Sequence, residues 1–222
     1  MMLHLQNILN PAEIAQLLGS MATSTFVSGR ELSGPNTPAS KHNLQMPWGA
    51  PQAQALTSVV VGALERSKAF HAAAQPNRMS PPLFTHYREG MGYGEHLDAP
   101  IMHHPMGLLR SDLSATLFLS TPDEYEGGEL VIHTGMGQTS MKCGAGDLLL
   151  YPSNALHRVS QVTRGVRSVV IFWIQSQVRD AAKRRILFDL AQVAERMPPE
   201  MSAERQMLAN THANLLREWA EL

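Results

Sequence analysis

The feature that most restricts the fold of this chain is a succession of short strand-like segments between residues 82 and 174. The segments are rich in Val, Leu, Phe and Tyr, and turn residues separate them at a spacing of roughly 8–12 residues. They cover residues 83–87, 93–98, 113–119, 129–133, 138–142, 148–152, 157–159 and 167–174. Segments of this length and spacing are typical of a β-sandwich or barrel, a class that includes the double-sheet jelly roll.

Helices are predicted on the N-terminal side of these strands. Asn10 is suited to cap a helix, because its side chain can accept a backbone hydrogen bond while Glu13 reaches back, and Gly19 can end that helix. A second helix is expected over residues 51–74, where apolar residues recur at helical spacing. Between the two helices, residues 28–42 are polar and rich in Gly and Pro, which predicts a long loop of the kind that often has a function.

The chain becomes helical again after the last strand. Residues 180–197 and a final segment with Leu208, Leu215, Trp219 and Leu222 carry apolar side chains at helical spacing, and two adjacent prolines separate them. The predicted fold is therefore α+β and mainly β, with a jelly-roll or cupin-like core, flanking N-terminal helices and a C-terminal helical segment. We divide it into a core of residues 1–177 and an extension of residues 178–222, which would pack on the core or form a homo-oligomer with a partner subunit.

The composition argues against several classes of partner. The 222 residues carry a formal net charge of −1 and no long run of one charge, so there is no electrostatic case for binding nucleic acid or a membrane surface. The longest apolar run, around residues 169–174, is too short to cross a bilayer, and the N-terminus lacks the pattern of a signal peptide. Cys143 is the single cysteine, and we expect it to be a packing residue in a cytoplasmic protein.

A candidate metal motif lies in the second of the predicted strands. His96 and Asp98 flank Leu97, directly after a glycine-rich run over residues 88–94. In a strand, residues two apart point to the same face, so the imidazole and the carboxylate would aim at one point. They would supply two of the three ligands of the 2-His-1-carboxylate site found in non-haem Fe(II) oxygenases. The structural alternative is a polar strand end with no metal.

The remaining parts of such a site are present further along the chain. His157 begins a later strand and is the candidate third ligand. Three ligands on one face of the metal would leave positions for a bidentate 2-oxo acid and for O₂. Arg167 follows ten residues later, and its guanidinium fork suits the far carboxylate of a dicarboxylate such as 2-oxoglutarate. Tyr87, and less directly Thr116, could add a hydroxyl hydrogen bond there. Arg167 could instead be a salt-bridge partner and Tyr87 a core residue.

These motifs together resemble the Fe(II)- and 2-oxoglutarate-dependent dioxygenases of the prolyl-4-hydroxylase type, and in particular the bacterial PKHD-type hydroxylases. Further matching stretches are Lys41-His42-Asn43-Leu44-Gln45, Tyr125-Glu126-Gly127-Gly128, Leu156-His157-Arg158-Val159 and Phe172-Trp173-Ile174-Gln175-Ser176. The resemblance covers nearly the whole chain and implies a double-stranded β-helix. It also implies that Fe(II) is held by His96, Asp98 and His157, that 2-oxoglutarate binds Arg167, and that L-ascorbate keeps the iron reduced.

The resemblance implies a reaction but no particular substrate. A C–H bond would be hydroxylated while 2-oxoglutarate is converted to succinate and CO₂, on a peptidyl side chain or on a small molecule linked to iron acquisition. His103 and His104 follow the metal motif, and Asn43 and Gln45 follow the long loop, so all four are candidates for the substrate side. The run after the motif and the turn near Met136 differ from the family pattern, which leaves the substrate open.

Two other functions are compatible with parts of the sequence. A non-catalytic metal-binding or small-molecule-binding protein could use the same cupin-like barrel, but it would have no need for Arg167. An assembly protein could depend mainly on the C-terminal helices, but that function would not explain the two histidines and the aspartate. The combination of all four site residues favours the oxygenase.

Overall fold

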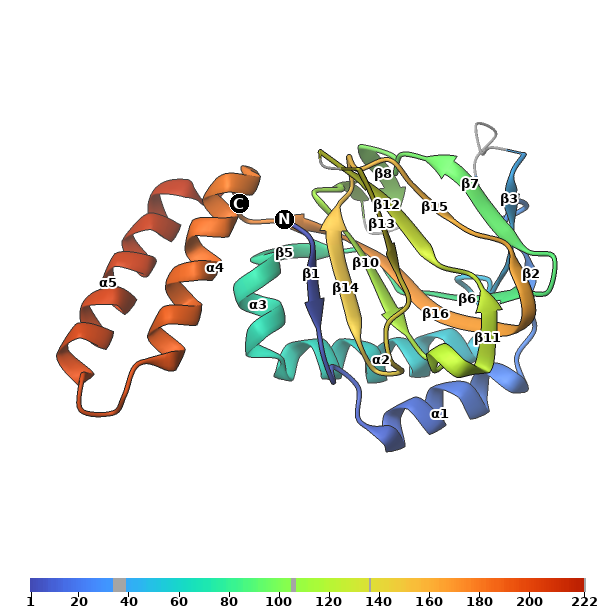
Figure 1. The fold of residues 1–222 in the computed structure, drawn as a ribbon, viewed down its shortest axis with the longest axis horizontal. Helices are drawn as coiled ribbons and strands as arrows, with labels where there is room; N and C mark the ends of the chain where they lie inside the picture. The colour runs from blue at the N-terminus through green and yellow to red at the C-terminus, as the bar shows by residue number, and fades with distance from the viewer. Residues whose placement is uncertain (34–38, 105–106, 136, 222) are drawn as a thin grey trace.

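The computed structural model describes residues 1–33, 39–104, 107–135 and 137–221, and two sheets face each other at its centre (Figure 1). The larger sheet has the order β1 (Leu3–Leu5), β14 (Leu148–Pro152), β10 (Leu113–Phe118), β16 (Val162–Ser176), β6 (Leu83–Arg88), β4 (Leu44–Gln45) and β2 (Val27–Ser28). β5 (Pro76–Met79) and β11 (Tyr125–Gly127) also pair with β16. The smaller sheet has the order β13 (Gly137–Met141), β12 (Leu130–Thr134), β15 (His157–Val159), β7 (Gly92–His96) and β3 (Lys41–His42). The predicted jelly-roll core is thus confirmed.

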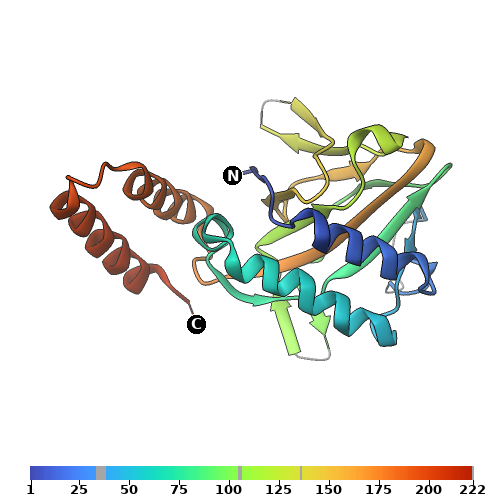
Figure 2. The ribbon, with the colours of Figure 1, turned by 90° about the horizontal axis from the view of Figure 1, so that it is seen from below.

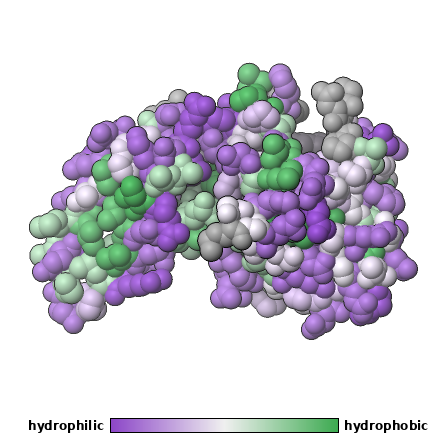
Figure 3. Space-filling view, turned by 45° about the horizontal axis from the view of Figure 1, so that its top comes forward, coloured by the Kyte–Doolittle hydropathy of each residue, from purple (hydrophilic) through white to green (hydrophobic). Residues whose placement is uncertain are grey.

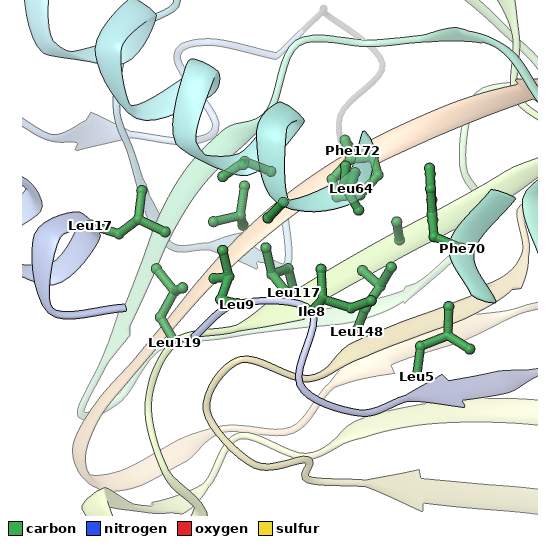
Figure 4. Packing of buried hydrophobic residues seen from close by; sticks show 14 of the residues in the cluster. Leu5, Ile8, Leu9, Leu17, Leu64, Phe70, Leu117, Leu119, Leu148 and Phe172 are labelled. Carbon is green, nitrogen blue, oxygen red and sulfur yellow. The ribbon is translucent and has the colours of Figure 1, made fainter. Parts of the chain in front are cut away.

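Three helices cover the outer face of the larger sheet, as Figure 2 shows from below. They are α1 (Pro11–Ala22), α2 (Pro51–Arg66) and α3 (Lys68–Ala74). Between helices and sheet lies the main apolar core, in which Leu17, Leu64 and Phe70 from the helices face Leu148 and Phe172 from the sheet (Figure 4). Each of these side chains is nearly or fully buried, which contributes roughly 1.5–3 kcal/mol per residue to folding.

The helix boundaries differ in two places from those predicted. The capping box at Asn10 is confirmed, because Glu13 N donates to Asn10 Oδ1 at 3.0 Å and Asn10 N donates to Glu13 Oε2 at 3.0 Å. However, α1 continues past Gly19, since its next turn buries Met21. The single helix expected over residues 51–74 is wrong, because Ser67 is extended and its hydroxyl accepts from Phe70 N at 3.1 Å, which starts α3.

A second core, between the two sheets, contains more aromatic and polar groups. Tyr87 and Phe118 from the larger sheet pack there with Leu130 and Val159 from the smaller sheet. Cys143 belongs to this core and is buried, as predicted, and burial raises the pKa of its thiol to about 11. The mixed composition of this interior is what leaves polar side chains available for a site between the sheets.

The two C-terminal helices project from one end of the sandwich (Figures 1 and 3). They are α4 (Ala181–Arg196) and α5 (Ser202–Trp219), and α5 packs along α4 while no residue of α5 is buried. After α5 the chain returns to the core, where Arg110 Nη1 donates to Glu221 Oε2 at 3.1 Å. In the part of the chain that the structure describes, none of the helices combines the length and apolar character needed to cross a lipid bilayer.

Candidate metal and co-substrate site

Strand pairing in the smaller sheet brings the two predicted histidine ligands together. His96 is the last residue of β7 and His157 the first of β15, and the antiparallel register places them directly opposite each other. Cross-strand partners lie close enough for their side chains to interact. The two imidazole centroids are accordingly 4.2 Å apart.

Backbone carbonyl groups determine which nitrogen of each imidazole faces the cavity. His96 Nδ1 lies 2.8 Å from Gly94 O, and His157 Nδ1 lies 2.9 Å from Ala155 O. A carbonyl oxygen only accepts, so each Nδ1 must carry the proton and donate. The Nε2 lone pairs are therefore free to bind a metal, and this is the arrangement by which metal-ligating histidines are usually oriented.

Asp98 completes the cluster from a position just beyond the strand. β7 ends at His96, so the strand-alternation argument used for Asp98 does not apply as predicted. A hydrogen bond orients the carboxylate instead: Ser114 Oγ donates to Asp98 Oδ2, and Ser114 Oγ lies 2.9 Å from Ser153 Oγ. Asp98 Oδ2 is 3.8 Å from His157 Nε2, and one ligand atom from each of the three residues lies within 4.8 Å of the others.

The surroundings of His96 keep its imidazole neutral. Burial, and after it the neighbouring His157, lowers the pKa of His96 to about 4. The ring of Tyr93 stacks on His96 with a centroid distance of 3.6 Å, and burial raises the pKa of this phenol to about 12. At neutral pH His96 is therefore a neutral imidazole, the form that binds metals.

Arg167 lies in the larger sheet, directly opposite Tyr87 in the pairing of β16 with β6. It is only 1% exposed, and its Cζ is 5.0 Å from the Tyr87 ring centroid and 5.4 Å from that of Phe118. Among the described residues, nothing accepts a hydrogen bond from Arg167 Nε or Nη1. A buried cation without acceptors is costly, so these two N–H groups are suited to a bound anion.

Tyr87 is fully buried beside this guanidinium. Asn43 Nδ2 donates to the Tyr87 hydroxyl at 3.0 Å, and burial raises the pKa of the phenol. The hydroxyl therefore keeps its proton and can donate it in a hydrogen bond to an anion held by Arg167. Asn43 Oδ1 has no donor in the described part of the chain, so this amide can also accept a hydrogen bond from a ligand.

One cavity between the sheets joins the metal cluster to Arg167. Its lining residues are Lys41, Asn43, Gln45, Tyr87, Tyr93, His96, Asp98, Thr116, Leu130, Tyr151, His157, Val159, Arg167, Ile171 and Trp173. The candidate substrate-side residues Asn43 and Gln45 are thus part of the wall. His103 is exposed on the hairpin of β8 (Ile101–His104) and β9 (Gly107–Arg110) and does not line the cavity, and the side chain of His104 lies outside the described part.

Sequence reasoning missed two residues of this site. Ser114 is one of few polar residues in an otherwise apolar strand, which was the only local signal for a special role. Lys41 lies at the end of the predicted loop and was taken only as part of a family motif. No sequence spacing reveals the contact of Ser114 with Asp98 or the position of Lys41 in the cavity, because both depend on how the two sheets pack.

The donor set fits the groups that the sequence motifs imply. Two neutral imidazoles and one carboxylate are the ligand set of mononuclear Fe(II) oxygenases, and the unpaired guanidinium N–H groups of Arg167 fit a carboxylate. The cavity therefore has a metal-binding end and an anion-binding end. A dicarboxylate that contacts both would bridge the two sheets.

Comparisons with known proteins agree with this chemistry. The model of the 2OG-Fe(II) oxygenase superfamily matches residues 82–175. PKHD-type hydroxylases from Synechococcus sp. and from Methylobacterium nodulans are each 42% identical to the chain, with 100% of both chains covered.

Solved structures share the fold at lower identity. A prolyl-4-hydroxylase from Pseudomonas putida has a TM-score of 0.52 at 17% identity, covering 79% of this chain and 92% of its own. HygX from Streptomyces hygroscopicus, with nickel and 2-oxoglutarate bound, has a TM-score of 0.53 at 15% identity, covering 77% and 81%.

Proposed function

The chain belongs to the PKHD-type hydroxylases of the 2OG-Fe(II) oxygenase superfamily, and we propose on this basis that His96, Asp98 and His157 hold Fe(II) while Arg167 holds 2-oxoglutarate. The protein is a hydroxylase. When bound, Fe(II) with 2-oxoglutarate and O₂ supplies the oxidative chemistry that hydroxylates a C–H bond and releases succinate and CO₂. The substrate that is hydroxylated is not identified by its relatives' names.

The metal-binding end works through residues that are oriented before any ligand arrives. The carbonyls of Gly94 and Ala155 hold the Nδ1 protons of the two histidines, and Ser114 holds the carboxylate of Asp98. Such partners typically contribute 10- to 100-fold to metal affinity, roughly, because the ligands need not reorganise on binding.

The co-substrate end works through charge and the exclusion of water. Arg167 would receive the far carboxylate of 2-oxoglutarate on its guanidinium N–H groups, and Tyr87 would add its hydroxyl, as expected from the sequence. Thr116 lines the same cavity and could donate a further hydrogen bond. The guanidinium is buried, so its attraction for a carboxylate is screened less than at a surface.

The observation that carries this proposal is the buried guanidinium of Arg167, whose Nε and Nη1 lack acceptors among the described residues, in the same cavity as the histidine–aspartate cluster. The test is succinate formation from 2-oxoglutarate by purified protein with Fe(II), together with metal binding by His96→Ala. We expect slow uncoupled turnover that this variant abolishes along with metal binding. Metal binding that survives His96→Ala would contradict the assignment.

Several finer assignments are also proposals. Asn43 and Gln45 would contact the substrate from the cavity wall, and the exposed His103 would reach only a large substrate. His104 stays a candidate for the substrate side. L-Ascorbate is the proposed reductant for the iron. The buried thiol of Cys143 is compatible with the cytoplasm as the proposed location, since it needs no oxidising compartment.

We also propose that residues 178–222 form a separate helical unit through which two chains associate. No residue of α5 is buried, and Val193 and Met207 of the two helices are 52% and 69% exposed. Light scattering of the protein and of a Val193→Glu/Met207→Glu variant tests this. We expect a dimer that the variant converts to a monomer, and a monomeric parent protein would contradict it.

A further inference from the structure

Lys41 is a second cation in the cavity, and the co-substrate assignment does not use it. It lies in β3 at the edge of the smaller sheet, opposite Tyr93 of β7, and its side chain lines the cavity that also contains the metal cluster. Its Nζ is 5.6 Å from the centroid of the Tyr93 ring, and that ring stacks on His96. The ammonium is therefore one aromatic ring away from a proposed metal ligand.

The ammonium has few partners among the described residues. Nζ donates to Ser33 Oγ at 2.6 Å and, more weakly, to Gln45 Oε1 at 3.5 Å. An ammonium has three N–H groups, so these two described partners leave one for another acceptor. Neither partner is charged, and in the described part of the chain no carboxylate forms an ion pair with Lys41.

The sum of the charges in the cavity shows that Lys41 lacks a counter-charge there. Lys41, Asp98 and Arg167 are the lysine, carboxylate and arginine among its lining residues. The two positive charges of Fe(II) and the negative charge of Asp98 sum to +1, and Arg167 raises the sum to +2. Dianionic 2-oxoglutarate would neutralise this charge. Lys41 then remains as a partly buried cation with no counter-charge among the residues that line the cavity. The nearby residues 34–38 supply no acidic side chain either, since they are Gly, Pro, Asn, Thr and Pro.

We propose that Lys41 binds a carboxylate of the hydroxylated substrate, so that this substrate is an organic acid whose oxidised carbon lies a few bonds from its anionic group. The proposal rests on the function proposed above, because it places the substrate beside the metal. Gln45, which is 3% exposed and lines the same wall, would add an amide N–H to the carboxylate.

The electrostatics of the unliganded site agree with this assignment. Burial lowers the pKa of Lys41 to about 8, and Asp98 opposes that shift. When Asp98 binds a dication, its support for the ammonium decreases, and an incoming anion can replace that support. A neutral peptide backbone or an alcohol would leave the ammonium without compensation.

The test compares matched neutral and anionic probes on protein loaded with Zn(II) and N-oxalylglycine, which occupy the metal and Arg167. Benzoate against benzamide, and phenylacetate against phenylacetamide, are titrated by calorimetry into the parent protein and into Lys41→Met and Lys41→Arg. Lys183→Met is the matched control, because Lys183 Nζ also lies over an aromatic ring, that of Trp219 at 5.3 Å, but on the C-terminal helices.

We expect each carboxylate to bind the parent protein about tenfold more tightly than its amide. A tenfold difference in affinity corresponds to about 1.4 kcal/mol of binding free energy. Lys41→Met should lose this preference, while Lys41→Arg and Lys183→Met should keep it, and the affinity for N-oxalylglycine should be the same in all four proteins. Equal binding of acid and amide, or a preference that survives Lys41→Met, overturns the proposal. So does a loss of N-oxalylglycine affinity in Lys41→Met, which would assign Lys41 to the co-substrate.

A second measurement needs no variant. Acetylation of Lys41 by acetic anhydride, followed by mass spectrometry, should be slowed by benzoate and not by benzamide. Equal protection by both probes counts against the proposal. If the parent protein does not bind N-oxalylglycine at all, the function proposed above fails, whereas the acid–amide comparison and the acetylation result still decide the assignment of Lys41.

Discussion

Replacing Arg167 by Met should leave the free protein about as stable as before, although it removes a large buried side chain. Arg167 is 1% exposed and leaves Nε and Nη1 without acceptors, which costs roughly 1–3 kcal/mol per unsatisfied group. The methionine gives up contacts of the guanidinium with the rings of Tyr87 and Phe118, worth about 0.5–2 kcal/mol each. These two effects have opposite signs and similar size, so we expect a change in the free energy of unfolding within about 1 kcal/mol.

The same substitution should nearly abolish the binding of 2-oxoglutarate. The guanidinium can make two charge-assisted hydrogen bonds to a carboxylate, each worth about 1.5–3 kcal/mol. Their loss costs about 3–6 kcal/mol, which raises the dissociation constant about 10²- to 10⁴-fold. A residue that is neutral for stability and essential for a ligand is the signature of a binding residue, in contrast to a packing residue.

Urea denaturation and thermal unfolding with Zn(II), with and without 2-oxoglutarate, measure both quantities in one set of samples. Arg164→Met is the control, because Arg164 lies on the same strand but is exposed and pairs with Glu126. We expect 2-oxoglutarate to raise the melting temperature of the parent and the control but not of Arg167→Met. The reasoning is refuted if Arg167→Met loses more than about 2 kcal/mol without ligand while 2-oxoglutarate still stabilises it.

Three further outcomes follow from the structure. Ser114→Ala removes the hydrogen bond to Asp98 and should weaken Zn(II) binding about 10- to 100-fold by calorimetry, whereas the exposed Ser58→Ala should not. Burial lowers the pKa of His86 to about 4, so the unfolded chain binds more protons between pH 6.5 and 4 and stability falls as the pH drops through that window. Because His86 is partly exposed, we expect the free energy of unfolding measured by urea denaturation to fall by about 1–2 kcal/mol over this range. His86→Gln should remove this pH dependence. Gly165→Ala should lower the free energy of unfolding by more than about 2 kcal/mol, because Gly165 has a φ of +79° and an added Cβ would lie 2.1 Å from a backbone carbonyl.

The sequence predicts the parts of this molecule that depend on local chemistry or on strand periodicity. The capping box of Asn10 and Glu13 is local, and it was found at the expected atoms. The break at Ser67 was missed because the apolar spacing continues across it, and only the serine hydroxyl, which caps α3, interrupts the helix. A periodic pattern describes which face is buried, but it does not show where one helix gives way to the next.

The pairing of His96 with His157 is different, because it depends on register. Residues 61 positions apart become direct neighbours only after β15 and β7 have paired, and the resemblance of the whole chain to a family supplied that information where the residues alone could not. The bulge in this pairing, between His157 and Val159, has no sequence signal of its own. Local motifs thus identified the ligand types, and topology alone brought them together.

Contacts between the two sheets are the least visible in the sequence, and the site depends on one of them. The proposed metal ligands belong to the smaller sheet or to its loop, whereas Arg167 and Tyr87 belong to the larger sheet. Among the residues that the structure describes, no backbone hydrogen-bond ladder links the two sheets, so side-chain packing determines their relative position. Ser114 of the larger sheet holds Asp98 at the end of β7, and it therefore ties the metal-binding end to the sheet that carries the anion-binding end. A ligand that bridges both ends needs that distance to be constant, which gives the serine a function that its position in an apolar strand does not reveal.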